Sequence, residues 1–419
     1  MIPRIFLKKK EELELKHGFP WVFNNEIDTV KFEAKNGSGV KTVSYTDAEA
    51  MAVESGSVVE VCAKSGEFLG TGVLNHNSVI AVRIIGRGHA DRILEDVPGY
   101  FLAKIQAAYD LRKKFYSTKD SYRLIFGESD FIPGLIVERY VDLKKNVYLV
   151  VQFSTLSCEI FKNEILNALR KVCKPFGIFE KSDDPNREKE GLKLKSCWHG
   201  EVRDEKIVIR ENDVLIEVDL VNGQKTGYFL DQKNNRQLVG SLCEGKRVLD
   251  AFAHTGAFAL NAIKCGAKEA IAVDFSERAV DLIKRNAELN HSTDKLTAVC
   301  ADVFDVLKEY EKNGEKFDVI ILDPPAFTKS AKNIEKAYGG YKEINLRAMR
   351  LLNPGGILAT CSCSHFFDAQ NFYSMIMKAA TDSKRRVQIL AKTGAGPDHP
   401  ILAGYPKSEY LKCAVCRVL

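Results

Sequence analysis

The sequence lacks the long apolar runs and the leader that would direct it into or across a membrane. None of its segments reaches the roughly 18 uncharged apolar residues that a membrane-spanning helix needs. The opening stretch, MIPRIFLKKKEELELKHG, also contains no apolar core of a signal peptide. We therefore expect a cytoplasmic protein with no membrane partner.

No cysteine pattern indicates a complete metal site either. The chain has 11 cysteines, which we expect to be reduced because a protein without a secretion signal stays in the cytosol. Cys413 and Cys416 have the spacing of half a zinc site, but no second pair or nearby His completes it. The sequence predicts no bound metal.

Size and charge set broader limits. A chain of 419 residues is too long for one ordinary core, so we expect two or three domains. The composition, 45% hydrophobic and 28% charged, is that of a globular protein. The net charge of +5 permits a polyanionic partner without requiring one.

The first 200 residues contain two blocks. Residues 1 to about 85 carry β signals separated by Gly and Asn, with a polar loop or hairpin insertion at 33–46. Residues 98–200 mix helical and strand patterns and predict an α+β block. The predicted strands are 21–23, 57–61, 68–74, 79–85, 134–139, 146–152 and 177–181, and the predicted helices lie near 98–116 and 157–173.

From about residue 222 onward, fully apolar strands alternate with helical patterns. This alternation is typical of a doubly wound, mainly parallel sheet, in which ligands bind at the carboxyl ends of the strands. The predicted strands are 247–252, 270–274, 298–301, 317–323 and 356–361, and the predicted helices lie near 256–265, 276–290 and 340–352.

Acidic residues stand at the ends of three of these strands. Asp250 is followed by a tight turn that needs Gly256, but a dinucleotide fingerprint would need three glycines. Asp274 lies where an acid accepts ribose hydroxyls, and Asp302 lies where an acid accepts an adenine amine. Ribose and adenine contacts without a diphosphate cradle indicate a nucleoside-type cofactor.

The next two strands end in groups suited to catalysis. Asp323 begins an Asp-Pro-Pro-Ala-Phe motif, in which consecutive prolines stiffen the turn and leave carbonyls and a carboxylate to face a planar base. Cys361 ends the last predicted strand and Cys363 lies two residues beyond it. The two thiols share a face if the chain stays extended. A thiolate there, added to carbon 6 of a pyrimidine, makes carbon 5 nucleophilic. We prefer Cys363 as the nucleophile because it lies nearer the loop. An alternative alignment of this segment favours Cys361, and a third possibility is that both thiols only pack in the core.

The DAFAHTGAF loop, Asp274, Asp302 and the DPPAF motif resemble motifs I to IV of class I methyltransferases that use S-adenosylmethionine. The resemblance implies that the first loop approaches the methionine part, that Asp274 holds the ribose and that Asp302 lies by the adenine. The predicted cofactor site comprises Phe229, Asp250, Phe252, Thr255, Gly256, Asp274, Asp302, Asp323 and Pro324.

A closer resemblance extends over nearly the whole chain. The segment NGQKTGYFLDQKNNR at 222–236, the DPPAFTKS and YKEIN motifs and the final LKCAVCRV are similar to the 23S ribosomal RNA cytosine-5 methyltransferase family named for large-subunit methyltransferase I. The segments HGFPWVF and GEFLGTGVLN resemble a PUA domain, an RNA-binding β-barrel. Residues 28–56 are longer than such a domain usually shows, which puts its RNA contacts in doubt.

The predicted fold is thus α/β, with a small PUA-like β-barrel (1–90), an α+β central domain (91–205) and a Rossmann-like class I methyltransferase domain (206–419). The predicted activity is methylation of cytosine carbon 5 in RNA, with Cys363 or Cys361 as nucleophile and Asp323 on the base. A guanine or adenine N-methyltransferase and a non-catalytic RNA-binding assembly factor are the alternatives. A homodimer is compatible with this domain arrangement.

Overall fold

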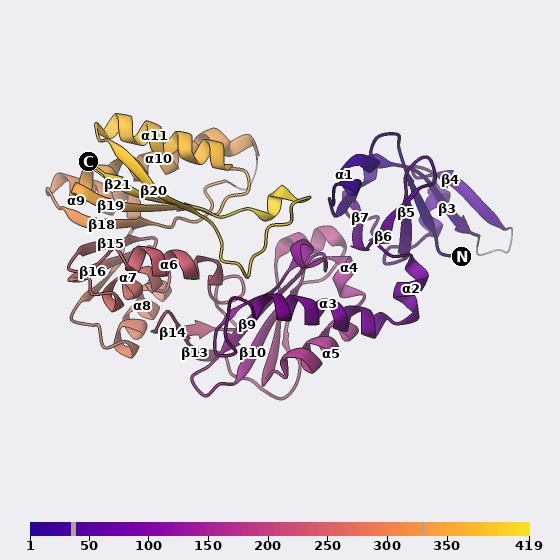
Figure 1. Ribbon diagram of the computed structural model, residues 1–419, viewed down its shortest axis with the longest axis horizontal. Coiled ribbons are helices and arrows are strands. Elements are labelled where there is room, and N and C mark those ends of the chain that lie inside the picture. Colours follow the sequence, from indigo (N-terminus) through magenta and orange to yellow (C-terminus); the bar gives the residue numbers. More distant parts are fainter. Residues whose placement is uncertain (35–38, 329–330) are drawn as a thin grey trace. The chain divides into compact units, whose positions relative to one another are not determined.

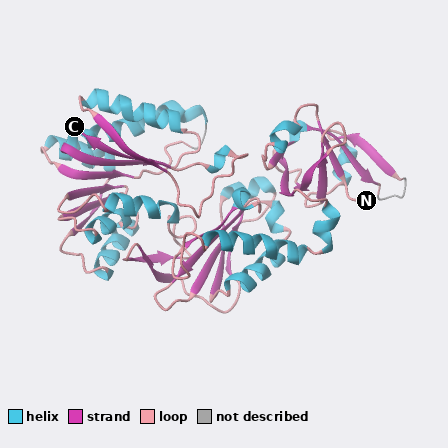
Figure 2. Ribbon diagram, viewed as in Figure 1, coloured by secondary structure: helices cyan, strands magenta, loops and turns pink. Residues whose placement is uncertain are grey.

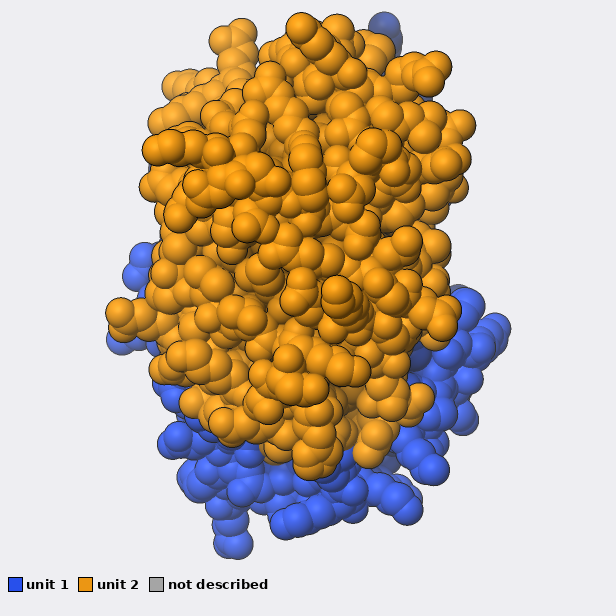
Figure 3. All heavy atoms as spheres, turned by 90° about the vertical axis from the view of Figure 1, so that its left-hand side faces the viewer, with its two compact units in different colours: residues 1–206, 219–228, 397–408 blue, residues 207–218, 229–396, 409–419 orange. Residues whose placement is uncertain are grey.

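The computed structural model describes residues 1–34, 39–328 and 331–419. The chain divides into two compact units, coloured separately in Figure 3. Unit 1 comprises residues 1–206, 219–228 and 397–408, and unit 2 comprises residues 207–218, 229–396 and 409–419. The predicted domain boundaries at residues 90 and 205 stay predictions.

Unit 1 begins with a seven-stranded sheet in the order β2-β7-β6-β5-β1-β3-β4 (Figure 1). The four predicted strands are present, and of the polar insertion at 33–46, Glu33 pairs with Val40 where β3 and β4 meet, whereas residues 35–38 lie outside the described residues. The sequence analysis missed β1, which is only four residues long. The elements are β1 (Arg4–Leu7), α1 (Glu12–Lys16), β2 (Trp21–Phe23), β3 (Ile27–Glu33), β4 (Val40–Ser44), β5 (Val58–Cys62), β6 (Phe68–Leu74), β7 (Ile80–Gly86) and α2 (Ala90–Glu95).

A second sheet in unit 1 has the order β12-β11-β10-β9-β8. Helices α3 and α5 contribute buried apolar side chains, among them Ile105 and Ile165, to the core that includes this sheet. The elements are α3 (Val97–Arg112), β8 (Tyr122–Phe126), β9 (Leu135–Val141), β10 (Val147–Phe153), α4 (Leu156–Glu159), α5 (Lys162–Cys173), β11 (Gly177–Ser182) and β12 (Lys195–Trp198). The hairpin of β13 (Lys206–Glu211) and β14 (Val214–Asp219), which follows in the sequence, belongs almost entirely to unit 2.

The sheet of unit 2 confirms the predicted doubly wound architecture (Figures 1 and 2). Its order is β17-β16-β15-β18-β19-β21-β20; neighbours from β17 to β19 pair in parallel, whereas β21 is antiparallel to both β19 and β20. The strands are β15 (Arg247–Ala251), β16 (Glu269–Asp274), β17 (Leu296–Cys300), β18 (Phe317–Leu322), β19 (Leu352–Ser362), β20 (Val387–Thr393) and β21 (Lys412–Val418).

The helices of unit 2 include two that the sequence analysis did not identify, α9 and α11. Both are amphipathic and place apolar residues such as Val306 and Met375 in the core. The helices are α6 (Lys233–Gly240), α7 (Ala257–Lys264), α8 (Glu277–Leu289), α9 (Val303–Lys312), α10 (Ile334–Leu351) and α11 (Ala369–Ser383). Within the described residues, no helix is both long enough and apolar enough to cross a membrane.

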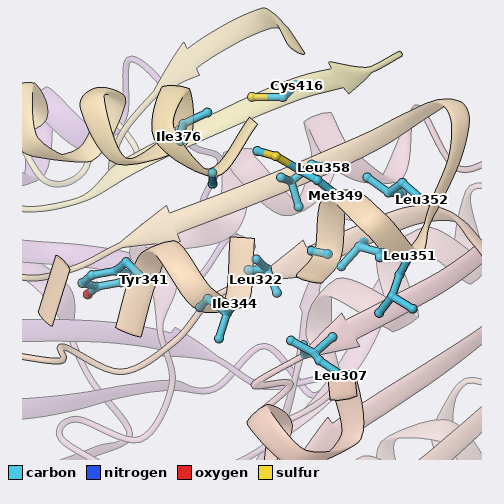
Figure 4. Close-up of a cluster of buried hydrophobic side chains, with 14 of the residues drawn as sticks. Leu307, Leu322, Tyr341, Ile344, Met349, Leu351, Leu352, Leu358, Ile376 and Cys416 are labelled. Atoms are coloured by element: carbon cyan, nitrogen blue, oxygen red, sulfur yellow. The ribbon is translucent and has the colours of Figure 1, made fainter. Parts of the chain in front are cut away.

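The core of unit 2 explains the apolar strands of the sequence. Leu322 of β18, Leu358 of β19 and Ile344 of α10 lie in one buried cluster, shown in Figure 4. Val319, Ile320 and Ile321 are consecutive and all fully buried. Helices cover both faces of a parallel sheet, so its central strands need not alternate with polar residues.

The strand order also locates a switch point. From β15 the chain builds outward through β16 to β17, then returns to the other side of β15 with β18 and β19. The carboxyl ends of β15 and β18 therefore flank the place where ligands bind in such sheets.

Candidate functional site

The predicted site residues of the strand ends lie along one edge of the unit 2 sheet. Because β15 to β19 run parallel, their carboxyl ends share that edge. In spatial order the groups are Asp302, Asp274, Asp250, Asp323 and then Cys361 with Cys363. We call the first three the acid half of the edge and the last three the thiol half.

The loop after β15 has an unusual backbone. Phe252, His254 and Gly256 all have left-handed φ angles, of 67°, 50° and 73°. Left-handed φ is uncommon outside glycine and concentrates at functional sites. A Cβ on Gly256 would lie 3.1 Å from the Ile283 side chain, so this turn needs glycine for both φ and space. The carbonyl of the buried Thr255 accepts a hydrogen bond from Asn286 Nδ2 at 3.0 Å.

Asp250 is fully buried at the centre of the edge. Its Oδ2 accepts a hydrogen bond from the Ala259 amide at 3.0 Å, whereas Oδ1 has no hydrogen-bond partner among the described residues. Burial, followed by the nearby Asp323 and Asp274 carboxyls, raises the pKa of Asp250 to about 8. The carboxyl group is thus mainly protonated at neutral pH, and because Oδ2 already accepts, Oδ1 is the oxygen that can carry the proton and donate it to a ligand.

Asp274 and Asp302 are held by backbone amides. Asp274 accepts from the amides of His254 and Ser276 at 2.9 and 3.0 Å, and Asp302 accepts from that of Phe304 at 2.7 Å. Asp274 is 9% exposed, whereas Asp302 is largely exposed and caps α9. Each carboxylate is therefore oriented and ready to accept a further donor.

Phe229 stands beside the loop after β15. Its carbonyl accepts a hydrogen bond from Arg236 Nη2 at 2.7 Å, and Arg236 is itself paired with the buried Glu211. The Phe229 ring lies edge-on to His254, with centroids 4.9 Å apart. Burial lowers the pKa of His254 to about 4, so its imidazole is neutral at physiological pH. Phe229 and His254 therefore form an aromatic contact beside this loop, within unit 2.

In the thiol half, Asp323 is oriented by a side chain that the sequence analysis missed. Gln232 Nε2 donates to Asp323 Oδ1 at 2.9 Å, and Gln232 Oε1 accepts from Asn235 Nδ2 at 2.6 Å. Both residues belong to the conspicuous 222–236 segment, but nothing in their spacing pointed to a carboxylate 91 positions away. Pro324 follows Asp323 and is buried.

The two thiols occupy different environments. Strand β19 ends at Ser362, so Cys361 lies within the sheet and Cys363 lies beyond it. Cys361 is fully buried opposite Cys413 of β21. A hydrogen bond with Cys413, burial and the Asp323 carboxylate raise its pKa well above the ordinary value. Cys363 is half-buried. Of the two, Cys363 is the one accessible from the carboxyl edge.

Aromatic rings border this half of the edge. Tyr341 of α10 accepts a hydrogen bond from Ser362 Oγ at 3.1 Å, and its ring centroid lies 4.5 Å from that of Phe327. Phe327 in turn lies 6.3 Å from Phe252, at the start of the acid half. The rings form a continuous apolar boundary between the two halves, which suits a flat ligand.

In unit 1 the structure brings together Glu180, Cys197 and His199, all metal-binding residue types. His199 Nε2 and Glu180 Oε2 are 2.8 Å apart, but Lys162 Nζ lies 2.8 Å from the other carboxylate oxygen. Burial would raise the pKa of Glu180, yet His199 and Lys162 lower it to about 2. Because the Lys162 ammonium already neutralises the carboxylate, this cluster is better described as an ion-pair network than as a metal site. The sequence analysis did not identify it.

Comparison with known proteins gives consistent matches. A family model described as S-adenosylmethionine-dependent methyltransferase matches residues 194–400, and a PUA-like domain model matches residues 5–87. The chain is 38% identical over 424 residues to a ribosomal RNA large subunit methyltransferase I of Aliivibrio fischeri, covering 100% of both chains. It is also 38% identical over 417 residues to that of Aeromonas salmonicida, covering 99% of this chain and 98% of the relative.

Solved structures share the fold over the full length. A putative methyltransferase from Streptococcus mutans superposes with a TM-score of 0.79 at 24% identity, covering 100% of both chains. A putative methyltransferase complexed with SAH gives a TM-score of 0.80 at 23% identity with the same coverage.

Proposed function

The chain belongs to the ribosomal RNA large subunit methyltransferase I family and uses S-adenosylmethionine, and from this premise we propose that it methylates carbon 5 of a cytosine. The RNA would be 23S ribosomal RNA, and the reaction would pass through a covalent adduct with Cys363. The observation that carries the proposal is the contrast between Cys361, sealed in the sheet, and Cys363, half-buried just beyond it.

The acid half fits the cofactor. Asp250 Oδ1 is a buried polar atom with no partner among the described residues, so a ligand group that hydrogen-bonds to this protonated oxygen would satisfy it. Asp274 would hold the ribose hydroxyls and Asp302 the adenine, with Phe229, Phe252, Thr255, Gly256 and Pro324 lining the remainder. When bound, S-adenosylmethionine supplies an electrophilic methyl group on its sulfonium sulfur.

The thiol half fits the acceptor base. The Cys363 thiolate would add to carbon 6 of the cytosine, so that the sulfur lone pair forms the new bond and carbon 5 gains enamine character. Asp323 would meanwhile hydrogen-bond the ring nitrogen or the amino group. Carbon 5 would then form a bond to the methyl group as the methyl–sulfur bond breaks and S-adenosylhomocysteine leaves; loss of the carbon 5 proton and elimination of the thiolate would restore the aromatic ring.

The target base must leave its stack to reach this edge, since carbons 5 and 6 are covered by neighbouring bases in a stacked strand. The partly exposed ring of Phe327, backed by the buried ring of Tyr341, would offer a surface for the extruded base. The residue that accepts the carbon 5 proton is unassigned, and a cytoplasmic homodimer stays a prediction.

The deciding experiment is mass spectrometry of nucleosides from ribosomal RNA incubated with the protein and methyl-labelled S-adenosylmethionine. We expect labelled 5-methylcytidine. Cys363→Ala should lose at least about 1,000-fold in rate because no adduct can form, whereas Cys361→Ala should stay within about tenfold.

Other outcomes identify the alternatives. A labelled N-methylated guanosine or adenosine, or an active Cys363→Ala variant, would refute the covalent mechanism. No labelled product together with no cofactor binding by calorimetry would favour an assembly factor without catalysis.

A further inference from the structure

Lys412 is a buried lysine to which the proposed reaction assigns no part. It is the first residue of β21, pairs with Ser362 of β19 and is 5% exposed. Its Nζ donates to the carbonyls of Ser364 and Tyr410 at 2.7 and 2.8 Å. The ammonium is thereby fixed beside the residue that follows Cys363.

Burying an ammonium is costly, and two neutral carbonyls compensate for only part of the lost hydration. Burial lowers the pKa of Lys412 to about 8, and Cys363, then Asp368 and Glu409, oppose that shift. Asp368 and Glu409 are both exposed, so water screens them. Of the three groups that oppose the shift, Cys363 has the largest effect and is the least exposed.

Among the described residues, Asp323 brings a carboxylate to the thiol half, whereas the nearby Tyr341, His365 and Lys392 bring no negative charge. Tyr341 of α10 has its pKa raised to about 12, mainly by burial, and is neutral. His365 is exposed and its ring lies 5.5 Å from that of Tyr410. On the β20 side, the Lys392 ammonium lies over the ring of Tyr373.

We propose that Lys412 is a positioning residue that holds Cys363 as a thiolate, aimed along the carboxyl edge for attack on the base. The thiol proton passes to solvent, Lys412 stays protonated, and the sulfur lone pair is then available to carbon 6. This inference rests on the proposed function of Cys363. It also gives a physical reason for the choice between the two thiols, because Cys361 faces Cys413 and the Asp323 carboxylate instead.

The test is the pH profile of iodoacetamide alkylation at Cys363 in the full chain, read by peptide mass spectrometry without RNA or cofactor. Lys412→Met should slow alkylation of Cys363 about tenfold at pH 7 and move the midpoint upward by about one pH unit. Lys412→Arg keeps the charge and should stay within about threefold. Exposed Cys300 is the internal reference and should not change.

The controls separate a charge effect from misfolding. Thermal unfolding and calorimetry with S-adenosylmethionine establish that each variant is folded. If Lys412→Met does not fold, Lys412→Gln keeps a hydrogen-bond donor without the charge and should give the same alkylation shift. An unchanged Cys363 profile in a folded, uncharged variant overturns the proposal.

The test distinguishes failure of this inference from failure of the proposed function. If Lys412→Met shifts the profile but the wild-type protein makes no 5-methylcytidine, the effect of Lys412 on Cys363 stands and the assigned reaction fails. If the protein makes 5-methylcytidine and the profile does not move, only the role of Lys412 fails.

Discussion

The acid half and the thiol half of the edge differ in where their side chains find partners. In the acid half, Asp250, Asp274 and Asp302 accept hydrogen bonds from backbone amides no more than 20 positions away. In the thiol half, Asp323 is oriented by Gln232, 91 positions away, and the loop after Cys363 is held by Lys412, 48 positions from Ser364. One half is built locally, the other by elements distant in the sequence.

The difference teaches what each half requires. Backbone amides at strand ends and helix starts are a rigid, sequence-independent way to orient a carboxylate, which suits repeated binding of one cofactor. A reactive thiolate is stabilised by positive charge beside it, which a lysine side chain from a distant element can supply. The following predictions test whether the two halves act separately.

The largest expected effect concerns Asp250 and stability. The pKa of Asp250 in the folded protein, about 8, exceeds the ordinary 3.8. The stability that the protonated carboxyl contributes is therefore fully present below about pH 4 and is lost as the pH rises toward 8. Asp250→Asn cannot ionise. Between pH 5 and pH 8 its free energy of unfolding should therefore rise relative to wild type by about 4 kcal/mol. Urea unfolding of both proteins at pH 5 and pH 8 measures these free energies. The same difference between variant and wild type at the two pH values would contradict a buried, protonated Asp250.

Asp323 tests the thiol half. Asp323→Asn keeps the shape but removes the charge that would contact the base, so kcat/KM for RNA should fall about 100-fold. Its affinity for S-adenosylmethionine, measured by calorimetry, should change less than about threefold. An equal loss in both quantities would place Asp323 with the acid half instead.

Asp274 tests the acid half. Asp274→Asn removes a carboxylate that would accept ribose hydroxyls, and the affinity for S-adenosylmethionine should weaken about 30-fold. The turnover number at saturating cofactor should stay within about threefold, as expected for a group that binds without entering the reaction. A turnover number that falls as much as the affinity would show that the halves are coupled.

The smallest effect is expected at Asp302, the matched control for Asp274. It is exposed, so water competes for any contact with the adenine. Asp302→Asn should weaken cofactor affinity by less than about threefold in the same calorimetric titration. A loss as large as that of Asp274→Asn would mean that the bound cofactor shields this position from solvent.

Much of the fold was predictable because the strands of unit 2 are apolar throughout. The consecutive apolar residues Val319, Ile320 and Ile321 indicate a strand covered on both faces. Such runs are typical of the central strands of a doubly wound sheet. Helices α9 and α11 were missed, and so was the short strand β1. Both helices are amphipathic, but polar residues interrupt their apolar faces along the sequence, and packing on the sheet supplies much of their stability.

The sequence by itself determined the order of chemical groups along the edge, because a parallel sheet brings successive strand ends to the same side. It also marked Gly256, since the turn needs a left-handed φ there. Only the tertiary structure decided the environments of the two thiols. Cys361 and Cys363 are two positions apart, yet β19 ends between them and β21 places Cys413 opposite one and Lys412 beside the loop that follows the other. Burial and charge act through space, so spacing alone could not distinguish them.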